Sequence, residues 1–321
     1  MNIRLIHEPT YTKWVLGQSH PTQGRRFTNA VDVLQQLADE SIVELVITPG
    51  RRATDAELLV VHTPEYIAQI EETFTCPEWN NAVDPDLADL ANRFFGGTMA
   101  GISHLKNGDK LVVHLPGAKH HAMADRSSGF CVYADFAAAA LTLASEGYKV
   151  AVLDIDAHHG DGTEVLTFDS DKILTFSVHQ QGIFPGTGVD VLDDTERHVH
   201  NRPLNAGDGN DELVVAVQEF VDLCSDFKPD FIFVACGGDG HISDPLASLE
   251  FTEAGVAMSL GLVRAAFPDT GILFGGAGGY RPDDHTPAMW VSGILSLSGM
   301  SEVQIRGCEL VERVRSLAST S

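Results

Sequence analysis

The sequence predicts an α/β fold in which helices cover both faces of a parallel β-sheet. Short apolar runs alternate along the 321 residues with longer stretches of helical periodicity. Several of these runs are continuous in Val, Ile, Leu and Phe, which is typical of strands buried on both faces of a parallel sheet. No internal repeat, low-complexity tract or Pro/Ser-rich linker divides the chain. One doubly wound domain over residues 1–321 is therefore expected.

The predicted strands are the apolar runs Ile3–Ile6, Leu111–His114, Val150–Ile155, Ile173–Val178, Phe231–Ala235 and Ile272–Phe274. The predicted helices are the stretches Leu87–Leu105, Phe136–Ala144, Asp211–Cys224, Thr252–Ala266 and Glu302–Leu317. In the third of these helices, apolar residues recur at i, i+1, i+4, i+7, i+8 and i+11. That spacing places a single apolar stripe on a surface helix, which would pack against the sheet.

The formal net charge of −24 bears on the class of partner. Nucleic acid is not an expected partner, because affinity for phosphates comes from clustered Lys and Arg that release counterions. A cationic substrate suits this charge better, while a solvated acidic surface is the simpler explanation from composition alone. Charge therefore says little about function by itself.

Neither membrane insertion nor export is expected. No apolar run approaches the roughly 18 to 20 residues of a membrane span, and the first 16 residues lack the apolar core of a signal peptide. The five cysteines are odd in number and form no Cys-x-x-Cys pair, so neither a disulfide framework nor a cysteine zinc site is indicated. We expect a cytoplasmic protein.

Polar residues follow four of the predicted strands, at the edge where an open parallel sheet binds its ligands. These segments are Pro116–His121, Asp156–Asp161, Gly237–His241 and Gly275–Tyr280. Because the carboxyl ends of parallel strands meet at one edge, the sequence predicts that ionisable side chains from four loops converge there.

A metal site is the first function that these loops suggest. Asp154, Asp156 and His158 alternate at a strand end and so share one direction, which lets a carboxylate and an imidazole bind one divalent ion. Asp239, flanked by glycines after another buried strand, is the expected third ligand. Such a set leaves an open coordination position and suits zinc, although Fe(II), Co(II) and Mn(II) would also be accepted. Alternatively, the two aspartates cap turns and His158 is a core histidine.

The neighbouring loops supply acid–base groups. His120 and His121 need polar partners if buried, and histidine can act as base and acid near neutral pH. Asp154 and Asp161 can orient these imidazoles. Tyr280, at the end of a glycine-rich loop, could bring a phenol to the oxyanion of a tetrahedral intermediate.

Together these motifs resemble one family. They are Gly117–His121, Gly129–Cys131, Asp154–Gly162, Phe184–Gly188, Asp239 with Asp244–Leu246, and Gly278–Tyr280. In their order they resemble the zinc-dependent histone deacetylase and acetylpolyamine amidohydrolase family, and the Gly-Phe-Cys-x-Tyr-Ala-Asp segment is similar to its class IV branch. The resemblance implies the three-layer arginase-deacetylase fold, with a parallel sheet of roughly eight strands and helices on both faces.

The resemblance also implies roles for individual residues. One zinc ion per chain would be held by Asp156, His158 and Asp239. His121, paired with Asp161, would be the general base and acid, and His120 would be the electrostatic partner of Asp154. Tyr280 would polarise the amide carbonyl. The implied substrate channel is lined by Phe130, Phe184 and Leu246, the implied potassium ligands are Asp154, Asp156, His158, Ser177 and Val178, and the residue matched to the acetate exit is Arg26.

The expected function is therefore zinc-dependent hydrolysis of an acyl group, with acetyl expected, from an acyl-lysine side chain or a small acylated amine. An acetylpolyamine amidohydrolase is the first alternative. The second alternative is a catalytically idle acyl-lysine binding protein. The sequence argues against it, because all the proposed metal, base and tyrosine positions are filled. A binuclear, arginase-like manganese hydrolase would need more ligands than the three residues proposed here supply.

Overall fold

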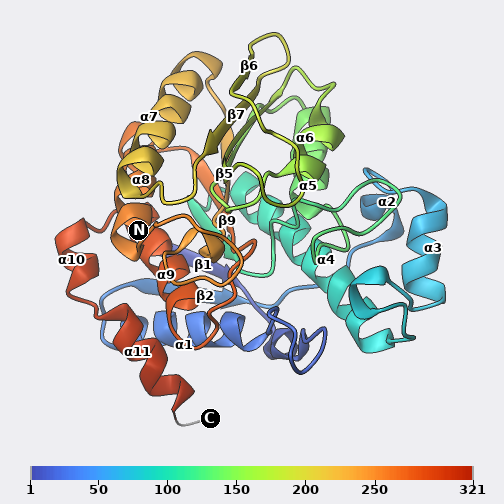
Figure 1. Cartoon of the computed structure of the whole chain (residues 1–321), viewed down its shortest axis with the longest axis horizontal. Coiled ribbons are helices and arrows are strands. Elements are labelled where there is room, and N and C mark those ends of the chain that lie inside the picture. The colour runs from blue at the N-terminus through green and yellow to red at the C-terminus, as the bar shows by residue number, and fades with distance from the viewer. Residues whose placement is uncertain (1, 320–321) are drawn as a thin grey trace.

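Nine β-strands form one sheet in the computed structural model, which describes residues 2–319 (Figure 1). Their order across the sheet is β2 (Glu44–Thr48), β1 (Asn2–Ile6), β3 (Leu111–His114), β9 (Gly271–Gly275), β8 (Phe231–Ala235), β4 (Val150–Asp154), β5 (Ile173–Gln180), β7 (Val199–Leu204) and β6 (Leu192–Asp194). All neighbours are parallel except β6 and β7. The predicted parallel sheet of roughly eight strands is confirmed.

The central strands are buried along their whole length, which explains their continuous apolar sequences. Every residue of β3, β4, β8 and β9 is buried. In the sheet register, Asp154 of β4 lies beside Ala235 of β8, and Ala235 lies beside Gly275 of β9. Gly275 in turn lies beside His114 of β3. Four strands therefore end at the same level, so the four polar loops leave the sheet at one edge.

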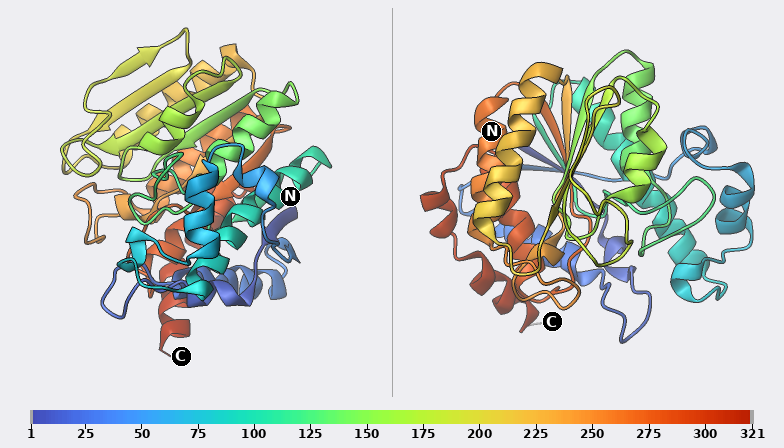
Figure 2. Two further views of the ribbon diagram at one scale, coloured as in Figure 1. Left: turned by 90° about the vertical axis from the view of Figure 1, so that its right-hand side faces the viewer. Right: turned by 45° about the horizontal axis from the view of Figure 1, so that its top comes forward.

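Helices cover both faces of the sheet, and the right-hand view of Figure 2 shows the sheet between the two layers. One layer consists of α1 (Arg25–Asp39), α7 (Asn210–Phe227), α8 (Glu253–Ala266), α9 (His285–Leu297), α10 (Glu302–Arg306) and α11 (Leu310–Ala318). The other consists of α4 (Pro85–Lys106), α5 (Asp135–Ser145) and α6 (Asp161–Thr167), with α3 (Pro64–Glu72) packed on α4 and α2 (Asp55–Leu58) nearby. Within residues 2–319 there are also three short 3₁₀ helices: η1 (Pro9–Lys13), η2 (Pro77–Trp79) and η3 (Gly238–Gly240).

Local sequence signals explain where the longest helix starts. Helix α4 begins with Pro85, whose missing N–H is not needed in a first turn, and the carboxylate of Asp84 accepts a hydrogen bond from Leu87 N–H at 2.9 Å. The prediction of one continuous helix over Glu302–Leu317 is wrong. The helix is interrupted between α10 and α11, where Glu309 adopts a left-handed conformation with φ of 50°.

Among residues 2–319, no helix is long and apolar enough to cross a membrane. The prediction of one domain over residues 1–321 stays a prediction, and its ends at residues 1, 320 and 321 lie outside the described residues.

Candidate active site

The loops after β4 and β8 bring the three predicted metal ligands together. His158 Nδ1 lies 3.2 Å from Asp156 Oδ1 and 2.9 Å from Asp239 Oδ2. One ligand atom from each of the three residues lies within 4.8 Å of the others, and all three residues are buried. Two carboxylates and one imidazole at these separations fit a divalent cation with an open coordination position.

Glycines allow two loops to approach these carboxylates closely. A Cβ on Gly237 would lie 2.3 Å from Asp156 Oδ2, and a Cβ on Gly278 would lie 2.3 Å from Asp239 Oδ2. Gly278 N–H donates a hydrogen bond to Asp156 Oδ2 at 2.7 Å. A backbone N–H therefore orients the Asp156 carboxylate, and no residue larger than glycine would fit at positions 237 and 278.

The three side chains influence one another's ionisation. Burial raises the pKa of Asp156, but the charges of His120 and His158 hold it below its usual range. Burial and the charge of Asp156 raise the pKa of Asp239. Burial lowers the pKa of His158, yet hydrogen bonds with the two aspartates outweigh burial and raise it to about 11. Because a metal ligand must be a neutral imidazole, a cation binding here would displace this proton.

The two predicted acid–base histidines each contact the predicted carboxylate. His120 Nδ1 lies 2.7 Å from Asp154 Oδ2, and His121 Nδ1 lies 2.7 Å from Asp161 Oδ1. The ring centroids of His120 and His121 are only 3.9 Å apart. Each carboxylate holds the Nδ1 proton of its imidazole, which leaves Nε2 of His121 free to accept one.

Adjacent histidines in this pair have opposite pKa shifts. Burial lowers the pKa of His120, but the charges of Asp154 and Asp156 overcome it and raise this pKa to about 9. Burial and the charge of His120 lower the pKa of His121 to about 4. Near neutral pH, His120 is therefore a cation and His121 a neutral imidazole, as a general base requires.

Tyr280 lines the same cavity as His121 and His158 and follows Gly279, whose φ of 120° lets the chain turn. Its backbone N–H donates to Asp244 Oδ2 at 2.8 Å. Burial and the charges of Asp239 and Asp156 raise the pKa of Tyr280 well above its usual range. The phenol therefore keeps its proton and can act as a hydrogen-bond donor.

A cavity of about 400 Å³ leads to these groups and contains the predicted channel residues Phe130, Phe184 and Leu246. His121, His158 and Tyr280 line the same cavity. Phe184 and Leu246 are 48% and 39% exposed, so they stand at its mouth. The structure thus joins the predicted channel to the predicted catalytic groups.

Sequence reasoning missed two residues of this region. Glu78 of η2 lines the channel, and its Oε2 accepts the Phe130 N–H at 2.8 Å. Lys119 lines a small inner space of about 20 Å³ behind the site, together with Arg26, and burial lowers the pKa of Lys119 to about 8. No sequence pattern around Glu78 indicates a role in the channel, because Glu78 lies far in the sequence from Phe130 and the other channel residues. Lys119 could have been found from its position directly before His120.

Arg26 and the predicted potassium ligands are buried near the centre. The guanidinium of Arg26 donates to Gly279 O at 2.6 Å and lies 5.9 Å from the Tyr280 ring. Ser177 lies beside Asp154 in the sheet register, and Val178 is the next residue of β5. Asp156 and His158 continue the loop from Asp154, with Asp156 N–H donating to Asp154 Oδ1 at 3.0 Å.

Comparison with known proteins places this arrangement in a family. The model of the histone deacetylase domain matches residues 20–294. A probable deacetylase of Archaeoglobus fulgidus is 30% identical over 79% of this chain and 73% of its own length. The acetoin utilization protein AcuC of Staphylococcus aureus strain MRSA252 is 31% identical over 87% of this chain and 77% of its own.

The fold has a solved counterpart as well. A crystal structure of an HDAC homologue from Aquifex aeolicus superimposes with a TM-score of 0.79 at 24% identity, covering 94% of this chain and 85% of the homologue. With a family model that spans most of the sequence, the assignment is direct: this chain belongs to the histone deacetylase family.

Proposed function

We propose that this protein is a zinc-dependent hydrolase that removes an acetyl group from a primary amine at the end of a slender chain, as in acetyl-lysine. One observation carries the proposal: His121, Tyr280 and His158 line one channel, and His158 contacts the carboxylates of Asp156 and Asp239. The relative named a probable deacetylase supports acetyl as the acyl group that is removed.

Asp156, His158 and Asp239 would hold the ion. When bound, a zinc ion supplies Lewis acidity toward the amide carbonyl and lowers the pKa of water. The two buried carboxylates give the site negative charge, and their hydrogen bonds from Gly278 N–H and Ala157 N–H fix their orientation.

His121 would move the protons of the reaction. Its free Nε2 takes a proton from the attacking water, while Asp161 holds Nδ1 at 2.7 Å and stabilises the resulting imidazolium. The same Nε2 then gives the proton to the nitrogen of the leaving amine. His120, already a cation beside Asp154, stays protonated and favours the negative charge that develops on the amide oxygen.

Tyr280 would donate a hydrogen bond to that oxygen. The phenol keeps its proton because burial and nearby carboxylates raise its pKa, and the edge of the Phe130 ring packs against it with centroids 6.0 Å apart. A preorganised donor of this kind contributes about 2.7–4 kcal/mol to transition-state stabilisation in acyl transfer.

Two features that the resemblance implies complete the proposal. A potassium ion held by Asp154, Asp156, His158, Ser177 and Val178 would stabilise the loop that carries the zinc ligands. Arg26, behind Tyr280, would assist the departure of the acetate anion.

The five described cysteines are all buried and unpaired, which supports a reducing cytoplasm as the location.

The test is a substrate panel for the zinc-loaded protein: acetyl-lysine peptides, peptides with longer acyl chains, and acetylated polyamines. Release of free amine and of acetate is measured together. Turnover of acetyl-lysine peptides supports the proposal, and faster turnover of acetylpolyamines assigns the small amines as the main substrates. Zinc-loaded protein that binds these compounds without hydrolysing any of them would instead establish an acyl-lysine binding protein.

A further inference from the structure

A second cluster of metal-ligating side chains lies outside the channel. It consists of His241, which follows η3, Glu253, the first residue of α8, and His285, the first residue of α9. Residues His241 and Phe251 form an isolated parallel β-bridge, which holds the η3 loop beside the start of α8. The fold thus brings three separate segments to one point.

The separations in this cluster match those of the proposed zinc ligands. Glu253 Oε1 lies 2.8 Å from His285 Nδ1, and Glu253 Oε2 lies 3.4 Å from His241 Nε2. The corresponding distances from His158 to its two aspartates are 2.9 and 3.2 Å. In a tetrahedral site with bonds near 2.0 Å, donor atoms lie about 3.3 Å apart. One cation could therefore be bound after small side-chain adjustments.

The imidazoles are held in orientations that suit this role. Their rings stack with centroids 4.1 Å apart and planes at 23°. His241 Nδ1 accepts the Ser243 N–H at 3.1 Å and lies 2.8 Å from the Ser243 hydroxyl, so that Nε2 faces Glu253. Binding of an ion through Nε2 would move the ring proton to Nδ1, where the Ser243 hydroxyl can accept it.

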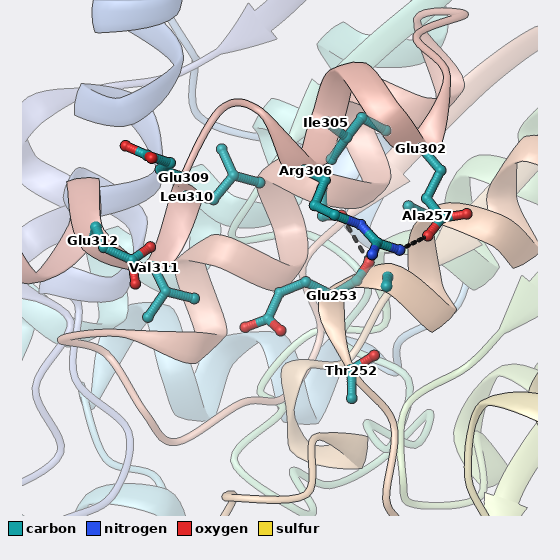
Figure 3. Close-up of a pocket in the computed structure, with 12 residues that line it drawn as sticks. Thr252, Glu253, Ala257, Glu302, Ile305, Arg306, Glu309, Leu310, Val311 and Glu312 are labelled. Atoms are coloured by element: carbon teal, nitrogen blue, oxygen red, sulfur yellow. Dashed lines mark hydrogen bonds and ion pairs between the residues drawn. The ribbon is translucent and has the colours of Figure 1, made fainter.

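An acidic cavity gives access to the cluster from solvent. Glu253 is one of the residues lining a cavity of about 290 Å³, and Glu302, Glu309 and Glu312, labelled with it in Figure 3, line the same cavity. Arg306, the one basic residue among those lining this cavity, is paired with Glu302. The excess of carboxylates around the opening favours the entry of a cation.

We propose that His241, Glu253 and His285 form a second divalent-metal site, separate from the site in the channel. Two imidazoles and one carboxylate are a ligand set that suits zinc and leave a position for water. A bound ion would join the starts of α8 and α9 to the loop after η3, which carries Asp244, the acceptor for the Tyr280 N–H. The site would then stabilise one wall of the channel.

Zinc stoichiometry tests this proposal. Wild-type protein and variants are freed of metal, equilibrated with Zn²⁺ alone and analysed by mass spectrometry for zinc per chain. Two equivalents are expected in the wild type, and one each in Glu253→Gln and His285→Ala. Loss of a ligand should weaken the second equivalent about 100-fold or more in a titration, because even changes to outer-shell partners cost about 10- to 100-fold.

Two further variants separate this site from the channel site. Asp239→Asn should also bind one equivalent, and the half-buried His104→Ala, outside both clusters, should bind two. A wild type with one equivalent that is lost in His285→Ala but kept in Asp239→Asn supports the second site and contradicts zinc in the channel. The second site is overturned if Glu253→Gln and His285→Ala both bind as much zinc per chain as the wild type and both are folded by circular dichroism.

Discussion

The ionisation states of His120 and His121 differ because their surroundings differ, although the two residues are neighbours in the chain. His120 is close to the carboxylates of both Asp154 and Asp156, whereas His121 contacts the carboxylate of Asp161 and lies beside the cationic His120. The pKa values of about 9 and about 4 suit the roles proposed for them, an electrostatic group and a base.

Removal of these groups should affect turnover far more than folding. We expect His121→Ala to lower kcat about 100- to 10,000-fold, because the base is lost. Tyr280→Phe should lower it about 100- to 1,000-fold, because a donor to the oxyanion is lost. Steady-state kinetics on an acetyl-lysine peptide measure both effects. Tyr148→Phe, which changes a half-buried tyrosine packed on Phe231, is the matched control. Wild-type turnover in either site variant contradicts its assigned role.

His62 should make stability depend on pH. Its Nε2 accepts the Ala134 N–H at 3.0 Å, and Nδ1 lies 3.3 Å from Ala124 O, so the folded protein requires the neutral imidazole. Burial lowers the pKa of His62 to about 4. Since the unfolded chain takes up this proton below about pH 6.5, stability is present above that pH and is lost as pH falls toward 4.

Urea unfolding at pH 7 and pH 5 measures this effect. Acidification should reduce the free energy of unfolding by about 2 kcal/mol more in the wild type than in His62→Gln. His104→Gln should behave like the wild type. Equal pH dependence in the wild type and His62→Gln would show that His62 is not held neutral.

The sequence predicts which residues meet in the site even though they come from separate segments of the chain. Asp156, His158 and Asp239 come together because the ends of parallel strands share an edge, a rule that needs no coordinates. Glu78 could not be predicted, because its approach to Phe130 depends on how a distant loop folds back over the channel.

Among the elements, the two glycine loops after β8 and β9 determine how closely the carboxylates can pack. A methyl group at position 278 would lie 2.3 Å from Asp239 Oδ2 and 2.6 Å from Asp156 Oδ2. Both atoms belong to proposed ligands, and neither is the end of a long, flexible side chain. These glycines therefore shape the proposed metal site, although they would supply no ligand.

Gly278→Ala should therefore weaken metal binding. We expect at least a tenfold increase in the Kd for Zn²⁺ at the channel site, with a parallel loss of turnover at limiting zinc, since displaced carboxylates lose their orientation. Gly307→Ala is the control, because a Cβ there would meet its nearest neighbour at an ordinary 3.4 Å. Zinc titrations followed by calorimetry compare the two. An unchanged Kd for Zn²⁺ in Gly278→Ala would contradict this prediction, because the loop could then shift without disturbing the metal ligands.

The strands that the sequence did not predict lie at the margins of the sheet, and the helices α1, α2, α3, α6 and α9 are also absent from the predicted set. Strands β2, β6 and β7 are absent from the predicted set, whereas the buried central strands were found. β2 is an edge strand with no fully buried residue, and β7 contains Pro203 and polar residues, so neither has the continuous apolar signal of the centre. The break between α10 and α11 was missed because the apolar spacing continues across it.

Over the whole molecule, the charge of −24 becomes meaningful once the site is known. Only a few of the acids belong to the channel site, so most of the excess lies elsewhere on the protein. Such a field should attract basic substrates toward the channel mouth.

Added salt should reveal this attraction. We expect kcat/KM for a Lys-rich acetylated peptide to fall about fivefold between low and high NaCl, while a neutral acetylated substrate of the same length changes little. The effect should lie mainly in KM, because salt screens the approach and leaves the buried groups unchanged. An equal response of both peptides would exclude electrostatic steering.

Hydrolysis should depend on a metal ion held by Asp156, His158 and Asp239. The most direct measurement is acetate release from an acetyl-lysine peptide by chelator-treated protein, before and after Zn²⁺ is returned. Chelation should abolish turnover, and Zn²⁺ should restore it in the wild type and in Glu253→Gln but not in a folded Asp239→Asn. Full turnover by protein with no detectable metal, or by Asp239→Asn, would contradict the claim.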